Sequence, residues 1–104
     1  DLTATIKSIN FIDSALKALE EVILQKNGIL LVTADHGNAE IMIDEKTQNP
    51  HTAHTCEKVP FILVQAEHNI KLKQRGTLAD ITPTILDLLT IQKPLTMEGH
   101  SLVI

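Results

Sequence analysis

The sequence predicts an α/β fold in which a mostly parallel sheet is flanked by helices. Two observations favour this class: a long amphipathic helix pattern at the start of the chain, and an apolar run directly after it that lacks polar alternation. A strand with two apolar faces is typical of a parallel sheet, because both faces of such a sheet are covered. A helix followed by a strand of this kind is half of a βαβ unit.

The first 26 residues predict one helix. Apolar residues recur there at spacings of three and four, which places them on one face of a helix. These residues are Leu2, Ile6, Ile9, Ile12, Leu16, Leu19 and Ile23. Asn27 and Gly28 then predict its end, because glycine adopts the left-handed conformation after a helix without a side-chain clash.

Two apolar runs, at 29–34 and 59–64, are the predicted strands, and 41–43 is a shorter candidate. Pro60 lies near the start of its run, where the missing N–H is tolerated. A second, shorter helix is predicted near 80–89, with its apolar face formed by Ile81, Ile85, Leu88 and Leu89. We expect Asp80 or Thr82 to cap this helix, with Pro83 in its first turn. No repeat or linker divides the chain, so one α/β unit is expected.

Composition excludes several classes of protein. The 104 residues are 43% hydrophobic and 21% charged, carry a net charge of −4, and include no Trp or Tyr. A nucleic-acid binder would need a basic footprint or stacking aromatic residues. No apolar run reaches the roughly 20 residues of a membrane helix, and the first residues lack the pattern of a signal peptide. The single cysteine, Cys56, cannot form an internal disulfide, which favours a reducing, cytoplasmic setting.

The strongest chemical feature is Asp35-His36-Gly37, directly after the first predicted strand. Ligands of open α/β sheets bind at the carboxyl ends of the strands, and a carboxylate beside an imidazole suits a divalent metal. Both side chains reach one ion only if the chain has left the strand, and Gly37 provides the freedom for that turn. The alternative is that Asp35 caps a turn and His36 is an ordinary loop residue.

A second loop carries His51 and His54, and a return of this loop to the strand ends would add ligands. The spacing is not that of a zinc finger, since only one cysteine lies nearby. Surface histidines without a role are the alternative. Lys71, Lys73 and Arg75 could attract a phosphate, but alternating lysines are more often a charged edge.

Five blocks of the chain resemble the cofactor-independent phosphoglycerate mutases of the alkaline phosphatase superfamily. They are Leu-Val-Thr-Ala-Asp-His-Gly-Asn-Ala-Glu at 31–40, Pro-His-Thr-Ala-His-Thr at 50–55, Val-Pro-Phe at 59–61, Leu-Ala-Asp-Ile-Thr-Pro-Thr-Ile-Leu-Asp-Leu-Leu at 78–89, and Met-Glu-Gly-His-Ser-Leu at 97–102. The resemblance covers essentially the whole chain, and the order of the blocks is specific. It implies a partial alkaline-phosphatase-like domain.

The resemblance also implies a site with two divalent metal ions, usually manganese. Asp35 and His36 match ligands of one ion, His54 matches a ligand of the other, and His51 falls beside the site in a supporting position. The implied reaction interconverts 3-phosphoglycerate and 2-phosphoglycerate through a phosphoserine, without bisphosphoglycerate. The implied partner is thus a small-molecule substrate rather than nucleic acid or membrane.

The departures from the family are as informative as the matches. No serine here matches the nucleophile, so the chain contains no catalytic residue of its own, and the substrate-binding domain and further metal ligands are missing. Thr90 stands where the family usually has glycine after the late helix. We therefore expect residues 1–104 to be the C-terminal part of the metal-binding domain, inactive alone. Unpartnered apolar surfaces then predict self-association of the isolated fragment.

Three other interpretations stay open at this point. The chain could be a fragment of a phosphopentomutase or of a metal-dependent phosphatase, which belong to the same superfamily. It could also be a free-standing metal-binding module without catalysis. The His-Thr-Ala-His-Thr block and the Asn-Ala-Glu after Gly37 favour the phosphoglycerate mutase.

Overall fold

The computed structural model describes residues 1–37, 58–67 and 69–104. They belong to two compact units, one within Asp1–Glu67 and one within His68–Ile104. The first contains α1, β1 and β2, and the second contains the short 3₁₀-helix η1 and α2. The candidate strand at 41–43 lies outside the described residues.

Helix α1 spans Leu2–Gln25, close to the predicted range. It begins at Asp1, whose carboxylate accepts a hydrogen bond from the Thr3 N–H at 3.0 Å. At its end the Gly28 N–H donates to the Ile23 carbonyl at 2.9 Å, and the Asn27 N–H donates to the Leu24 carbonyl at 3.1 Å. This pair of bonds is a Schellman motif.

The left-handed residue of that motif is Asn27, with φ 57°, and not Gly28 as predicted. Asparagine tolerates this conformation because its short polar side chain can bond locally. Gly28 has another use: a Cβ on it would lie 3.0 Å from Cγ2 of Ile23, which is tight contact. The pair therefore ends the helix as expected, but Asn27 takes the left-handed conformation predicted for Gly28.

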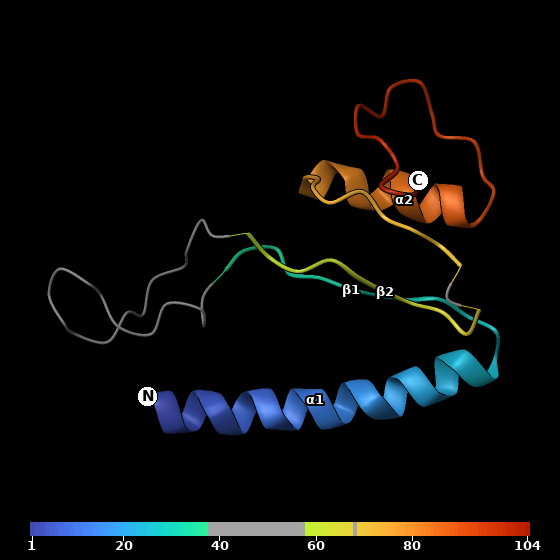
Figure 1. Ribbon diagram of the computed structural model, residues 1–104. Helices are drawn as coiled ribbons and strands as arrows, with labels where there is room; N and C mark the ends of the chain where they lie inside the picture. Colours follow the sequence, from blue (N-terminus) through green and yellow to red (C-terminus); the bar gives the residue numbers. More distant parts are fainter. Residues whose placement is uncertain (38–57, 68) are drawn as a thin grey trace, which may run out of the picture. The chain divides into compact units, whose positions relative to one another are not determined.

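Strands β1, Leu30–Val32, and β2, Ile62–Val64, form a two-stranded sheet (Figure 1). The strands are antiparallel, with Leu31 opposite Leu63. The α/β class holds, but the prediction of a mostly parallel sheet is wrong for this pair. An apolar run without alternation indicates that both faces are apolar, and it does not determine the direction of the neighbouring strand.

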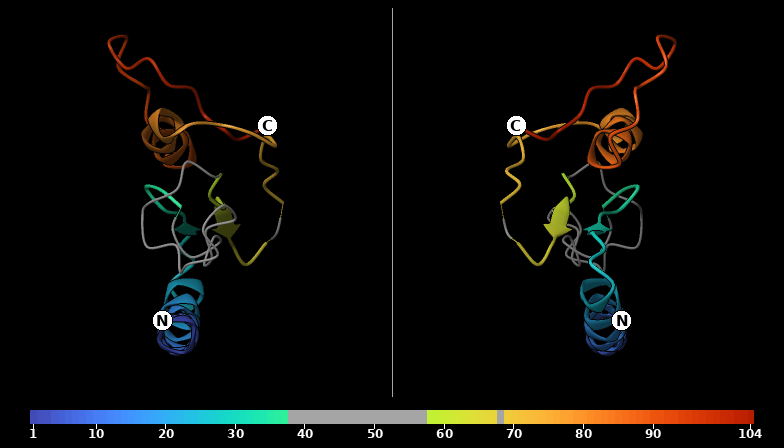
Figure 2. Two further views of the ribbon diagram at one scale, coloured as in Figure 1. Left: turned by 90° about the vertical axis from the view of Figure 1, so that its left-hand side faces the viewer. Right: turned by 90° about the vertical axis from the view of Figure 1, so that its right-hand side faces the viewer.

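Helix α1 lies on one side of the β1–β2 pair, as the views along the helix show (Figure 2). Leu16, Ile23 and Leu24 are half-buried, whereas most of the predicted apolar stripe stays exposed. The exposed fraction is 48–57% for Leu2, Ile6, Ile9, Ile12, Leu19 and Val22. The periodicity thus predicted the helix correctly, but most of its apolar face has no cover within the described residues.

In the second unit, η1 spans Leu78–Asp80 and leads directly into α2, Ile81–Leu88. Pro83 lies in the first turn of α2, as predicted, and is buried together with Thr84. Asp80 is the residue that precedes α2, but its carboxylate accepts from the Thr77 N–H at 2.8 Å and so caps η1. The predicted cap therefore acts one element earlier.

Helix α2 also ends in a Schellman motif. The Ile91 N–H donates to the Leu86 carbonyl at 2.8 Å, and the Thr90 N–H donates to the Asp87 carbonyl at 3.0 Å. Thr90 has φ 58° and so adopts the left-handed conformation that usually requires glycine. The replacement of glycine noted in the sequence therefore falls on a strained backbone position.

The last residues return to α2 and pack against it (Figure 1). Leu102 is 6% exposed and is the buried hydrophobic residue of the described chain. Leu72 and Val103 form an isolated antiparallel bridge. Gly99 lies so close to η1 that a Cβ on it would overlap the Ala79 carbonyl. Residues 99–104 are therefore an integral part of the second unit.

Candidate metal centre

Asp35 and His36 lie just beyond β1, where the sequence placed them. The strand ends at Val32, and the chain bends at Asp35 and His36. Thr33 helps to hold this exit, because its Oγ1 donates to the Pro60 carbonyl at 2.8 Å, at the start of the β2 segment. The segment that leads from β1 to the pair is thus tied to the segment that precedes β2.

The bend does not use glycine in the predicted way. None of the four glycines has a positive φ, so Gly37 does not supply a left-handed turn. Gly37 is buried, and its carbonyl oxygen lies 3.0 Å from His36 Nδ1. Its contribution in the structure is therefore an acceptor beside the imidazole ring.

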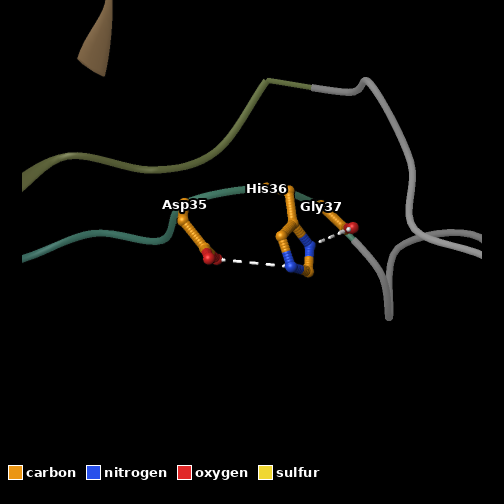
Figure 3. A network of polar contacts seen from close by, with 3 residues as sticks. All are labelled: Asp35, His36 and Gly37. Carbon is orange, nitrogen blue, oxygen red and sulfur yellow. Dashed lines mark hydrogen bonds and ion pairs between the residues drawn. The ribbon is translucent and has the colours of Figure 1, made fainter. Parts of the chain in front are cut away.

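The contact with Gly37 is consistent with one of the two tautomers of a neutral His36 ring (Figure 3). A carbonyl oxygen only accepts, so Nδ1 carries the hydrogen and donates to it. In the neutral ring Nε2 then holds the lone pair, and this atom lies 3.5 Å from Asp35 Oδ1. A histidine whose other nitrogen donates to a carbonyl has the usual arrangement of a metal ligand.

The two donor atoms suit a divalent cation. Asp35 Oδ1 and His36 Nε2 lie 3.5 Å apart, so both atoms could reach one ion. The Asp35 side chain is 84% exposed and that of His36 is 40% exposed, so both are accessible to an ion. As an ion pair alone, such exposed groups would add little stability.

The remaining predicted site residues, His51 and His54, lie outside the described residues. Within the described ranges, no cluster of three or more His, Cys, Asp or Glu side chains is suited to a metal. The structure therefore brings together two of the three predicted ligands, Asp35 and His36. It leaves His54 and the supporting His51 as predictions.

The remaining polar residues that the sequence singled out are either exposed to solvent or hydrogen-bonded within the second unit. Lys71, Lys73 and Arg75 are exposed, in keeping with a charged edge. The Ser101 hydroxyl donates to Asp87 Oδ2 at 2.6 Å, and the backbone N–H of His100 donates to Asp80 Oδ1 at 2.9 Å. Sequence reasoning missed these bonds, because nothing in a local pattern shows which helix the final residues meet. None of the described helices is long and apolar enough to cross a membrane.

Residues 1–93 match the metalloenzyme superfamily. The chain belongs to this superfamily. A 2,3-bisphosphoglycerate-independent phosphoglycerate mutase of Thermosynechococcus vestitus is 48% identical over 99% of the chain, which covers 21% of that enzyme. Enzymes with the same name from Clostridium beijerinckii and Pseudomonas syringae pv. syringae are 46% and 43% identical, over 97% and 99% of the chain and 20% of each enzyme.

These comparisons confirm the resemblance read from the sequence. The chain spans about a fifth of the length of the curated relatives that it matches. Membership of a metalloenzyme superfamily implies divalent metal ions. The exposed Asp35–His36 pair beyond β1 has donor atoms of the kind that bind divalent metal ions.

Proposed function

We propose that this chain is part of a cofactor-independent phosphoglycerate mutase, which interconverts 3-phosphoglycerate and 2-phosphoglycerate in glycolysis and gluconeogenesis. The observation that carries the proposal is the 41–48% identity to such mutases over nearly the whole chain. The orientation of His36 toward Asp35 supports it, because phosphoryl transfer of this type uses metal ions.

In this proposal Asp35 and His36 bind one of two metal ions, which we take to be Mn²⁺, and His54 binds the other. The ions, when bound, stabilise the negative charge that develops during phosphoryl transfer. The Gly37 carbonyl orients the His36 ring by accepting from Nδ1, which keeps Nε2 directed at the ion. His51 supports the site from beside it.

The nucleophilic serine comes from elsewhere in the longer protein. Of the serines in this chain, Ser14 donates to the Asn10 carbonyl within α1, and Ser101 donates to Asp87. Neither hydroxyl has a histidine as its hydrogen-bond partner, the usual base that activates a serine. The 104 residues therefore supply part of the site, and alone they should not convert 3-phosphoglycerate even with Mn²⁺ added.

The longer mutase that contains these residues is the material for the test. Asp35→Asn and His54→Ala should each lower kcat by about 10²-fold or more, because each weakens the charge stabilisation at the site. Asp13→Asn is the matched control, since Asp13 is an exposed residue of α1, and it should leave kcat unchanged. Near-normal turnover of His54→Ala would show that His54 is not a ligand and would make His51 the candidate.

A direct binding measurement separates the metal site from the activity. Titration calorimetry with Mn²⁺ should show weaker binding for Asp35→Asn than for the parent and Asp13→Asn proteins. Release of inorganic phosphate in place of 2-phosphoglycerate would indicate a phosphatase and contradict the mutase proposal. We also propose a cytoplasmic location, since the single cysteine and the glycolytic substrate both suit a reducing compartment.

A further inference from the structure

Residues 99–104, called the strap below, are held on one side by backbone pairing. The Lys73 N–H donates to the Leu102 carbonyl at 2.7 Å, and the Ile104 N–H donates to the Lys71 carbonyl at 2.9 Å. Together with the bridge between Leu72 and Val103, these bonds join the strap to 71–73 as a short antiparallel pair.

On the other side, three side chains of η1 and α2 hold three consecutive strap residues. Asp80, Thr84 and Asp87 follow the spacing i, i+4, i+7 and so share one face. Asp80 Oδ1 accepts from the His100 N–H at 2.9 Å, and Thr84 Oγ1 accepts from the Leu102 N–H at 2.9 Å. Asp87 Oδ2 accepts from the Ser101 hydroxyl at 2.6 Å.

Asp80 is the centre of this arrangement. Its Oδ2 accepts from the Thr77 N–H at 2.8 Å and the Thr77 hydroxyl at 3.3 Å, while its Oδ1 accepts from His100. Its backbone carbonyl accepts from Thr84 Oγ1 at 2.6 Å, and this orients the hydroxyl that receives Leu102. One carboxylate therefore ties η1 to the strap, and hydrogen bonds to an ionised acceptor are the stronger kind.

We propose that the strap is a releasable element and that the negative charge of Asp80 keeps it closed. A neutral Asp80 side chain offers fewer and weaker acceptor positions to the Thr77 and His100 donors. The hydrogen bond from the His100 N–H therefore weakens. The pairing with 71–73 then lacks its support from η1. The strap opens while α2, whose own backbone bonds do not involve Asp80 side-chain atoms, stays helical.

The direction of the pH effect follows from the same contacts. The His100 and Thr77 N–H groups hold the pKa of the Asp80 carboxyl below its ordinary value of 3.8, and the charge of the His100 imidazole adds to this. Among the charged side chains of the described residues, that of His100 is the one that lowers this pKa. A lowered folded-state pKa stabilises the closed strap at neutral pH, and this contribution is lost as the pH falls below 3.8 through that pKa.

The test is amide hydrogen exchange of the whole chain by NMR, corrected at each pH for the intrinsic rate. In Asp80→Asn at pH 7, protection of the His100 and Leu102 amides should fall at least about tenfold. The amide of Leu89, which donates to the Ile85 carbonyl in α2, should keep its protection. The parent should show the same selective loss only in acid.

Two control variants keep the test decisive. Asp87→Asn neutralises the other carboxylate that accepts a hydrogen bond from the strap, and the acid-induced loss of His100 protection should remain. His100→Ala keeps the backbone donor but removes the imidazole charge that lowers the Asp80 pKa. The loss of strap protection should therefore occur at a higher pH than in the parent. Full protection of the His100 amide in Asp80→Asn would overturn the proposal. Loss of Leu89 protection in acid at the same pH as the strap amides would overturn it too.

Discussion

Replacement of Thr90 by glycine should stabilise the second unit, because Thr90 occupies a left-handed position at the end of α2. Its φ is 58°, and both hydrogen bonds of the Schellman motif depend on this conformation. For residues with a Cβ the left-handed region costs about 1–2 kcal/mol, and a β-branched side chain is especially poorly suited to it.

The expected gain follows from three contributions. Glycine removes the left-handed strain of about 1–2 kcal/mol but adds about 0.5–1 kcal/mol of backbone freedom to the unfolded chain. The Thr90 side chain is exposed, and no hydrogen bond from it is found in the described part of the chain, so little is lost on truncation. The net effect should be a stabilisation of about 1 kcal/mol.

Amide exchange of Ile91 is the direct assay, because its N–H closes the motif at 2.8 Å. Its protection should rise about fivefold in Thr90→Gly, which corresponds to about 1 kcal/mol. Asn27→Gly is the matched control: Asn27 has φ 57° at the same place in the motif of α1 but already tolerates it, so its gain should be smaller. Unchanged or reduced protection of Ile91 would refute the assignment of strain to Thr90.

Three further predictions concern packing. Gly99→Ala should destabilise the second unit by about 1–3 kcal/mol in denaturant unfolding, since its Cβ would overlap the Ala79 carbonyl, and an unchanged midpoint would contradict this close approach. Thr84→Val should expose the Leu102 amide to exchange, because Thr84 is fully buried and its hydroxyl accepts from that amide, whereas Thr84→Ser should preserve the protection. The isolated chain should self-associate in light scattering through the exposed apolar face of α1, and a monomer at every concentration tested would show that this face needs no cover.

Local patterns predicted the helices well. The spacing of apolar residues and the polar pair Asn27-Gly28 placed both ends of α1 within one or two residues, since helix periodicity and capping act over a few positions. The direction of β2 relative to β1 was not predictable in this way. It depends on how the chain between them returns, and the apolar runs contain no information about that path.

In the candidate site too, local features could be predicted from the sequence and non-local ones could not. The position of Asp35 and His36 just beyond β1 was predictable, because a polar pair directly after an apolar run is a local signal. The orientation of the His36 ring by the Gly37 carbonyl was not, since it depends on backbone conformation. The bonds from Asp80 and Thr84 to residues 20 and 18 positions away were likewise beyond any local pattern. They arise only when the strap packs against α2.

The integral role of the strap determines where a reporter group can be attached. The Ile104 N–H donates to the Lys71 carbonyl, so a dye or affinity peptide attached at Ile104 would lie next to a paired backbone. The loop after α2 is better suited. Leu95 is 100% exposed, next to a turn in which the Met97 N–H donates to the Pro94 carbonyl. A cysteine introduced at Leu95 would carry a fluorophore at a fully exposed position outside the strap.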